Sequence, residues 1–258
     1  MSVRSISSTS PIRQSVSEAE WQTRVELAAC HRLMHHAGVR DLTHNHLTAR
    51  VPGEDHHFLI KPGDFMFDEV TASSLIKYDF DGNPAVEGQP KLRGGGLVIH
   101  AGLFAARPDI NACFHTHTAA NMGVASQKDG LLPINQHAMH FVDEIAYHDF
   151  GGFEFDIDMR APLIRDLGAK KVALLRNHGA LVCGESIGEA FVGHHFLEMA
   201  CQGQIAALSG SREVTLIPRE IQERAAAQRH ANTGHKTGGK DWVSALRLAE
   251  RLAPDFMN

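Results

Sequence analysis

Two short apolar segments separated by a polar turn restrict the fold of this chain more than any other feature. Residues 171–175 and 180–183 are each predicted to form a buried strand, and only Arg176-Asn177-His178-Gly179 lies between them. Gly179 gives this connection the freedom to adopt a positive φ. We therefore expect two core strands with a tight turn that carries His178.

The rest of the sequence mixes strands with helices. Ser17 and Glu20 form a candidate capping box for a helix that ends near Gly38. A second candidate N-cap, Ser186, begins a helix that runs to about residue 209. Further strands are predicted at 47–52, 57–61, 75–80, 111–116 and 145–148, and further helices at 96–106, 119–127, 158–167 and in the tail on either side of a polar loop at 230–240. This mixture predicts an α/β or α+β fold around one central sheet.

The chain has one predicted domain and a short leader. Its 258 residues are ample for a large core, and no internal repeat or linker divides them. The Ser-rich residues 1–17 are predicted to be a disordered leader, which leaves 18–258, including the C-terminal helices, as the domain.

Composition limits the partners and the location. The net charge is −5 and no long basic patch appears, which argues against nucleic acid. No segment approaches the roughly 18 apolar residues of a membrane helix, which argues against a membrane partner. The four cysteines are scattered in apolar stretches, as expected of buried free thiols in the reducing cytoplasm. A small molecule is the expected partner.

The sharpest chemical motif is Phe114-His115-Thr116-His117 at the end of a predicted strand. Side chains two residues apart on a strand point to the same face, so both imidazoles would project side by side. Such a pair can contribute to a three-histidine metal site. The same spacing also fits two exposed histidines at a strand end.

His178 is the candidate third ligand. Alone, a histidine at a turn is more simply explained by a hydrogen bond to nearby backbone. Its position between two core strands, together with the histidine pair that ends another buried strand, favours the metal site, since α/β folds place sites at strand ends. The 18 histidines of the chain also raise the expectation of metal or acid/base chemistry.

Several longer segments resemble a known family. They are TASSL at 71–75, HAGLFAARPDINACFHTHT at 100–118, GLLPINQHA at 130–138, IAYHDFGG at 145–152 and LLRNHGALVCGES at 174–186. Together they resemble the class II aldolase/adducin head-domain family from about residue 21 to 210. The LLPI-Q and AYHDFGG stretches look closer to its adducin-like branch, whose animal heads are non-enzymatic.

The resemblance implies a fold, a metal site and an assembly. It implies a single three-layer α/β/α domain with a mostly antiparallel central sheet. In the metal-dependent aldolases of the family, the residues that match His115, His117 and His178 hold zinc, so one divalent metal per subunit is expected, zinc first and iron(II) as the alternative. Those aldolases form homotetramers with the site between subunits.

The chain departs from the aldolase pattern at three places. Gly96 stands where the resemblance puts the catalytic Glu, and Gly94 and Gly95 stand where a Ser pair helps to hold phosphate. In the phosphate loop Asn45 matches, but His44 replaces the central Gly. The substrate is therefore expected to lack a phosphate. Gly94–Gly96 would either offer backbone N–H groups to an anion or simply connect to the next helix.

Other histidines are candidates for the missing acid/base group. His137 matches the region where a tyrosine of the neighbouring subunit donates a proton in the aldolases, and its ordinary pKa is near neutral. It also fits an extra metal ligand or a surface residue. His46 and His44 rank next, as residues that would face the substrate. Lys61 and Arg93 are candidate carboxylate clamps, or solvated surface charges.

Three functions are compatible with these residues. The first is a metal-dependent lyase that cleaves a carbon–carbon bond of a hydroxy or keto acid or decarboxylates it. The second is a non-haem iron oxygenase that carries out oxidative decarboxylation, because imidazole suits iron and zinc alike. The third is a non-catalytic scaffold of the adducin type. Three retained histidines favour an enzyme, because a structural zinc usually takes a fourth protein ligand.

Overall fold

A seven-stranded sheet forms the centre of the computed structural model, which describes residues 11–153, 155–210, 212–231 and 236–258. Its strand order is β3-β2-β1-β4-β7-β6-β5. All pairings are antiparallel except that between β5 and β6. The strands are β1 (His46–Arg50), β2 (His57–Ile60), β3 (Ile76–Asp79), β4 (Ala112–Thr116), β5 (Ile145–His148), β6 (Val172–Leu175) and β7 (Gly179–Gly184).

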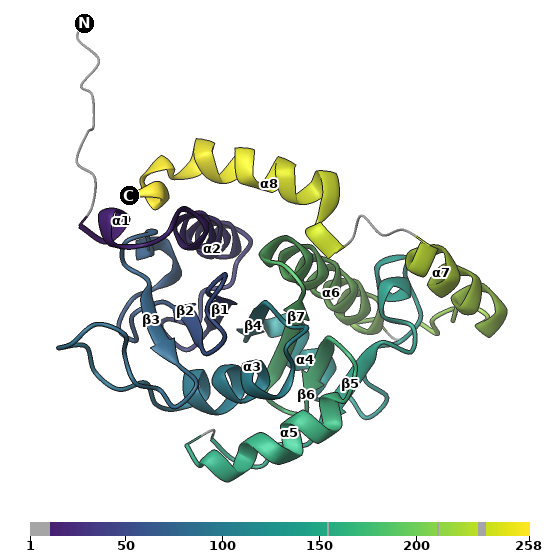
Figure 1. The fold of residues 1–258 in the computed structure, drawn as a ribbon. Helices are drawn as coiled ribbons and strands as arrows, with labels where there is room; N and C mark the ends of the chain where they lie inside the picture. Colours follow the sequence, from purple (N-terminus) through teal and green to yellow (C-terminus); the bar gives the residue numbers. More distant parts are fainter. Residues whose placement is uncertain (1–10, 154, 211, 232–235) are drawn as a thin grey trace, which may run out of the picture.

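Helices cover both faces of this sheet, so the predicted three-layer α/β/α architecture is confirmed (Figure 1). The α-helices are α1 (Pro11–Ser15), α2 (Glu18–His36), α3 (Gly102–Ala106), α4 (Ala119–Ala125), α5 (Arg160–Leu167), α6 (Ile187–Leu208), α7 (Arg219–Ala231) and α8 (Gly239–Leu252). Short 3-10 helices are η1 (Phe67–Glu69), η3 (His137–Phe141), η4 (Ile157–Met159) and η6 (Pro254–Met257), and η2 (Gly96–Ala101) is a π-helix.

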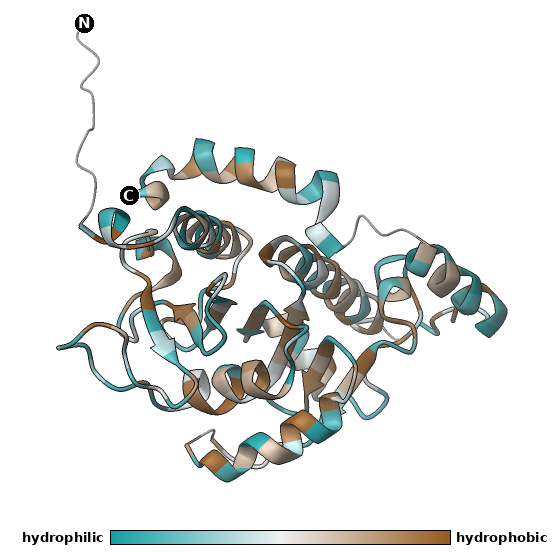
Figure 2. Ribbon diagram, in the orientation of Figure 1, coloured by the Kyte–Doolittle hydropathy of each residue, from teal (hydrophilic) through white to brown (hydrophobic). Residues whose placement is uncertain are grey.

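The residues of β6 are all apolar and do not alternate with polar residues. Val172 and Leu174 face the layer of α4 and α6, whereas Ala173 and Leu175 face the layer of α3 and α5. Because helices cover both faces of the sheet, every residue of this strand is buried and apolar. Figure 2 shows the same pattern as hydrophobic strands between helices whose outer faces are hydrophilic.

Helix α2 begins where the sequence predicts. The side chain of Ser17 accepts a hydrogen bond from the backbone N–H of Glu20 at 3.1 Å, and Gly38 after the helix has a φ of 98°. The buried carboxylate of Glu20 accepts from Arg24 at 2.9 Å and from Lys77 of β3 at 2.8 Å. These buried charges are paired, and they connect the first long helix to the edge strand of the sheet.

The structure differs from the predicted leader over part of its length. Residues 11–15, inside the stretch predicted to be disordered, form the short helix α1. Arg13 of this helix pairs with Glu18 and stacks on the ring of Trp21 at 5.4 Å, which gives the segment contacts that its Ser-rich composition does not suggest. Residues 1–10 lie outside the described residues.

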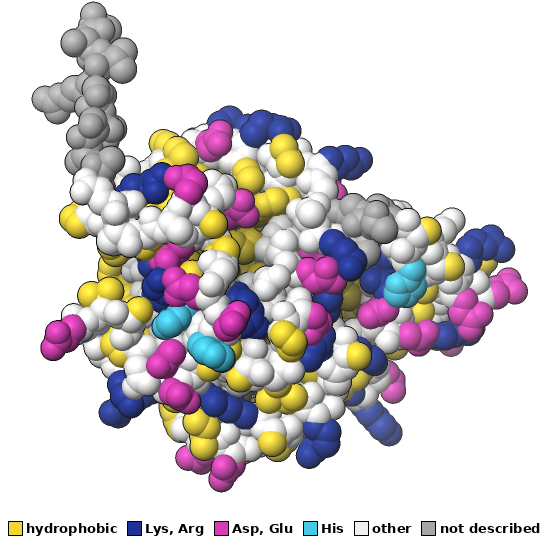
Figure 3. Space-filling view, in the orientation of Figure 1, with side chains coloured by type: hydrophobic (Ala, Val, Ile, Leu, Met, Phe, Trp, Pro, Cys, Tyr) yellow, Lys and Arg dark blue, Asp and Glu magenta, His cyan; other side chains and the backbone are white. Residues whose placement is uncertain are grey.

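Charges are interspersed on the surface. On the face drawn in Figure 3, Lys and Arg side chains alternate with Asp and Glu side chains. Within the part of the chain that the structure describes, no helix has both the length and the apolar character needed to cross a bilayer.

Three buried histidines make the fold sensitive to acid. Burial lowers the pKa values of His31, His100 and His194 to about 3, from 6.5 in an exposed side chain. The unfolded chain therefore binds protons that the folded chain does not bind between about pH 6.5 and pH 3, and stability falls as the pH drops through this range.

We expect His31→Leu to reduce this acid sensitivity. His31, on α2, packs edge-on against Phe67, and a leucine there takes up no proton on unfolding. Between about pH 7.5 and pH 5.5, the loss of unfolding free energy should shrink by about 1.4 kcal/mol, as measured by urea denaturation. The exposed His36→Leu is the control. Equal losses in both variants would show that His31 is not held neutral.

Candidate metal centre

Three histidines meet where β4 ends and β7 begins. His115 lies on β4, His117 follows its last residue, and His178 lies in the turn between β6 and β7. Because β4 and β7 pair directly, with Thr116 opposite Ala180, the end of one strand lies beside the turn that starts the other. Candidate ligand atoms of the three histidines all lie within 4.8 Å of one another.

The hydrogen bonds of two rings direct their other nitrogen into this cluster. Nδ1 of His115 donates to the carbonyl oxygen of Ala180 at 3.1 Å, and Nδ1 of His117 donates to the carboxylate of Asp41 at 2.9 Å. Each ring therefore presents the lone pair of Nε2. Nε2 of His117 lies 2.9 Å from Nε2 of His115 and 3.0 Å from Nε2 of His178.

This donor set fits a divalent transition metal. Metal–imidazole bonds of 2.0–2.1 Å allow ring nitrogens that share an ion to lie about 3 Å apart. Burial lowers the pKa of His115 well below 6.5, which favours the neutral ring that a metal requires. Converging lone pairs repel each other, and a bound cation removes that repulsion.

The loop before β1 supports His117 in a way that the sequence did not reveal. Besides the bond from the ring to Asp41, the backbone N–H of His117 donates to the side-chain oxygen of Asn45 at 2.6 Å. Lys61 donates to the carbonyl oxygen of Thr43 in the same loop at 3.1 Å, and burial lowers the pKa of Lys61 to about 8. In the structure, the side chains of Asn45 and Lys61 thus form hydrogen bonds with backbone groups of His117 and Thr43.

The sequence did not indicate that Asp41 contacts His117, because nothing in the neighbouring residues distinguishes Asp41 from other loop carboxylates. Only the pairing of β1 with β4, which sets His46 opposite His115, brings this loop to the cluster. The loop also contains Leu42, an exposed residue with a φ of 45°. Such a conformation is unfavourable for leucine and is often found at functional sites.

The glycine-rich segment is oriented differently from the sequence expectation. A Cβ on Gly96 would point to Leu92 and Ile60, at 3.0 and 3.1 Å, in the apolar layer. A Cβ on Gly95 would lie 3.2 Å from the ring of His46. Gly95, which immediately precedes a π-helix, is therefore the glycine that lies against His46. Gly94 precedes both, with a φ of 61°.

His44 and His46 lie near the start of β1 but differ in position. His46, the first residue of β1, lies beside the cluster, whereas His44 is exposed. The ring of His46 stacks on that of His115 with centroids 6.1 Å apart, and its buried Nδ1 has no hydrogen-bond partner. The ring of His100 lies edge-on to that of His46, with centroids 5.7 Å apart, and Nδ1 of His100 donates to the hydroxyl of Thr48. An unpartnered buried nitrogen is costly, and one beside a metal cluster can serve a bound molecule.

His137 lies elsewhere in the chain. It begins η3, with its ring 5.7 Å from that of Phe196 on α6, and it is not one of the three clustered histidines.

An apolar crevice borders His178 on its other side. Its lining includes the apolar side chains of Val98, Ile99, Leu175 and Phe150, with His148 and Asp149 as polar members, and the ring of Phe150 lies 6.0 Å from that of His178. The neighbouring loop exposes further apolar side chains, including Phe153 and Phe155. The immediate surroundings of the cluster are thus polar on the side of Asp41 and apolar on the side of Phe150.

Comparison with known proteins places this architecture in a family. Residues 25–205 match the family model for the class II aldolase and adducin N-terminal domain. An aldolase II superfamily protein from Pseudomonas syringae has a solved structure that is 40% identical, with a TM-score of 0.90 over 96% of this chain and 100% of that chain.

Two further relatives represent the two branches of the family. L-fuculose 1-phosphate aldolase from Glaciozyma antarctica PI12 is 25% identical, with a TM-score of 0.79 over 93% of this chain and 92% of that chain. Alpha-adducin of Rattus norvegicus is 41% identical over 73% of this chain, which corresponds to 26% of the adducin. The chain belongs to the class II aldolase and adducin N-terminal domain family.

Proposed function

We propose that this chain is a metal-dependent lyase of the class II aldolase type. It would cleave a carbon–carbon bond of a hydroxy or keto acid, or decarboxylate it. The observation that carries the proposal is the convergence of the Nε2 atoms of His115, His117 and His178, two of them oriented by hydrogen bonds from Nδ1. Three protein ligands leave one coordination position open for substrate, as in catalytic zinc sites, whereas a structural site fills that position with a fourth protein ligand.

One divalent metal per subunit is proposed at this cluster, zinc in the first place and iron(II) as the alternative. Bound there by three neutral ligands, such an ion keeps its charge and acts as a Lewis acid toward a substrate oxygen. Asp41 would orient His117, and Asn45 would hold its backbone. His46 and Gly95 would border the substrate, since a Cβ on Gly95 would lie 3.2 Å from the ring of His46 and narrow the space beside it.

The substrate is proposed to lack a phosphate. Gly94 and Gly95 offer no hydroxyl to a phosphate, and Gly96 faces the apolar layer. One cation near the cluster already serves the fold, because Lys61 donates to the backbone carbonyl oxygens of Thr43 and Pro62. The acid/base role is proposed for His137 of a neighbouring subunit in a homotetramer.

The adducin relationship supports a second candidate, a non-catalytic scaffold. Alpha-adducin matches this chain at 41% identity, higher than the aldolase from Glaciozyma antarctica at 25%. Activity decides between them. Protein loaded with zinc or anaerobically with iron(II) is incubated with short hydroxy and keto acids, and aldehyde, carbon dioxide and oxygen consumption are measured. Aldehyde or carbon dioxide without oxygen uptake supports the lyase, oxygen uptake supports an iron oxygenase, and no turnover with either metal supports the scaffold.

The buried, free cysteines support a cytoplasmic location for this activity. Cys30, Cys113, Cys183 and Cys201 are all unbonded thiols in the structure. Such thiols are typical of a reducing compartment.

His178→Ala is expected to abolish stoichiometric metal binding. The substitution removes one of three ligands at a half-buried turn, so the remaining pair should bind metal at least about tenfold more weakly. Metal content after dialysis, measured by mass spectrometry, checks this. His195→Ala removes an exposed histidine of α6 and should keep one equivalent. A full equivalent in the His178→Ala protein would contradict the proposed site.

Asp41→Asn is expected to weaken metal binding about 10- to 100-fold, as loss of a carboxylate behind a ligand histidine does elsewhere. The amide can still accept a hydrogen bond but lacks the charge that strengthens the bond from Nδ1 of His117. A competing chelator measures the affinity, and the absorption spectrum of the cobalt-substituted protein reports the ligand geometry. Asp129→Asn, at an exposed loop, is the matched control. Identical affinities for both variants would remove Asp41 from the site.

The quaternary proposal predicts a mass of four chains by light scattering at micromolar concentration. If His137 acts in a neighbouring site, mixed tetramers of His137→Ala and His178→Ala subunits should recover activity that neither variant has alone. A monomer, or mixtures without any recovery, would rule out a shared site.

A further inference from the structure

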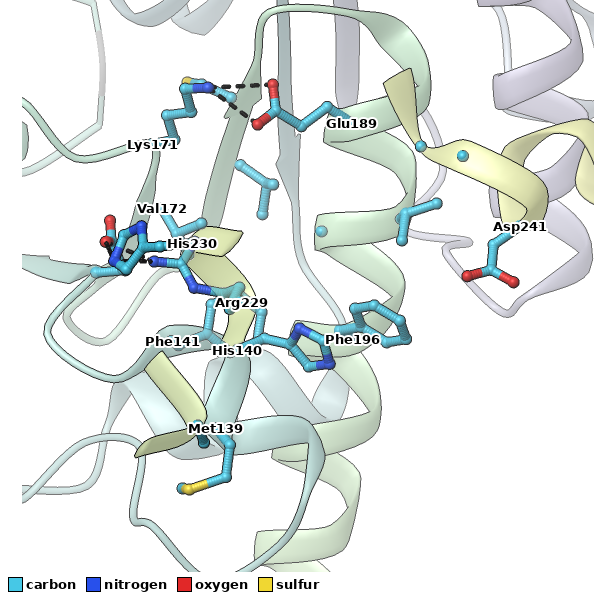
Figure 4. Close-up of a pocket in the computed structure, with 18 of the residues that line it drawn as sticks. Met139, His140, Phe141, Lys171, Val172, Glu189, Phe196, Arg229, His230 and Asp241 are labelled. Atoms are coloured by element: carbon cyan, nitrogen blue, oxygen red, sulfur yellow. Dashed lines mark hydrogen bonds and ion pairs between the residues drawn. The ribbon is translucent and has the colours of Figure 1, made fainter. Parts of the chain in front are cut away.

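A second cavity lies at the end of the sheet away from the metal centre. Val172 begins β6 and Val182 nears the end of β7, whereas His178 lies at the opposite ends of both strands. The cavity measures about 820 Å³, is open on one side, and is bordered by η3, α6, α7 and the start of α8. Figure 4 shows residues that line it. We call it the α6–α7 cavity. Its volume falls in the range of small-molecule sites.

The wall of the α6–α7 cavity is largely apolar. Val172 and Val182 come from the sheet, Val192 and Phe196 from α6, and Met139 from η3. His140 adds a flat surface, since its ring stacks on Phe196 with centroids 4.1 Å apart and planes 15° apart. Burial lowers the pKa of His140, so this ring is neutral at neutral pH.

The charges in this wall are balanced by one another. Lys171 pairs with Glu189 at 2.9 Å, and Arg229 of α7 pairs with Glu144 at 2.6 Å. The ion pair of Arg229 uses a terminal nitrogen, and its buried Nε, which has no hydrogen-bond partner, can donate to a neutral acceptor atom of a ligand. The dashed contact between Lys171 and Glu189 is visible in Figure 4. The rim adds one charge of each sign, Lys240 and Asp241. A charged ligand would have to compete with an existing ion pair in partly buried surroundings, which is costly.

Hydrogen-bonding groups that carry no charge remain at the wall. The amides of Gln136 on the η3 side and Gln228 on α7 both border the cavity, as does His140. An apolar cavity with a few such groups favours a ligand that has an apolar body and one or two neutral polar atoms.

We propose that the α6–α7 cavity binds an uncharged, mostly apolar small molecule, such as an aromatic alcohol, ketone or ester. This site is separate from the metal centre, and the inference does not rest on the proposed lyase activity. Binding there would add contacts between the body of the fold and α7, which in the described structure has no buried residue and is held by ion pairs such as Arg229–Glu144.

The neutral dye Nile red serves as the probe with the full-length chain. We expect saturable binding of one dye per chain, with enhanced fluorescence. Val192→Trp fills the cavity from α6 and should weaken binding about tenfold or more. Gln228→Trp, from the exposed side of α7, tests the same cavity without touching the core. Val243→Trp, at a 54% exposed position of α8, is the matched control and should bind as the unmodified chain does.

A second comparison tests the class of ligand. The anionic dye 1-anilinonaphthalene-8-sulfonate should bind more weakly than Nile red. Glu144→Gln leaves Arg229 without its carboxylate and should raise the affinity for the anionic dye several-fold. Asp143→Asn, whose partner Arg219 does not line the cavity, should not.

Three results would overturn the proposal. They are the absence of saturable Nile red binding, equal binding by the unmodified chain and both cavity-filling variants, and tighter binding of the anionic dye to the unmodified chain. A change in oligomeric state in Val192→Trp, but not in Val243→Trp, would also overturn it, because a neighbouring chain would then occupy the cavity. Melting temperature and metal content confirm that each variant is folded.

Discussion

The register of β4 against β7 is the constraint on which the rest of the candidate site depends. Thr116 lies opposite Ala180 and His115 opposite Leu181, so the histidines that end β4 meet the turn that begins β7. A shift of one residue would turn His115 to the other face of the sheet. This register is strongly specified because both faces are buried: Cys113 packs with the α3 and α5 layer, and Phe114 packs with the α2 and α8 layer. The apolar core thus determines where the polar cluster forms.

Polar groups around the cluster act on the histidines from three separate segments. The carbonyl of Ala180 comes from the partner strand, and Asp41 and Asn45 come from the loop before β1. Lys61, from the end of β2, holds that loop in turn. Each of these groups is satisfied by another protein group, as buried polar atoms must be. Two buried ring nitrogens beside the cluster have no such partner, Nδ1 of His46 and Nε2 of His100. The polar frame therefore orients the clustered rings, while these two nitrogens next to them form no hydrogen bond with the protein.

The two ends of β6 and β7 have different characters. At the turn, His178 joins a polar cluster beside an apolar crevice. At the other end, Val172 and Val182 border a cavity whose charges are paired. The sheet between them is buried on both faces and supports either end independently. Residues at the ends can change while the fold persists, because function is determined by local sites rather than by the fold.

The sequence by itself determined the local elements and the identity of the three clustered histidines. Apolar runs, Ser17 as a cap and Gly38 as a stop are local signals, and the strands and long helices follow them closely. Only the tertiary structure decided that Asp41 supports His117, that Gly95 lies against His46, and that His137 packs against Phe196. The physical reason is that these relations join segments far apart in the chain. Strand register brings Asp41 to a residue 76 positions away, and the backbone before the π-helix at 96–101 places Gly95 beside a strand that begins at His46. Neither is encoded in the spacing of neighbouring residues.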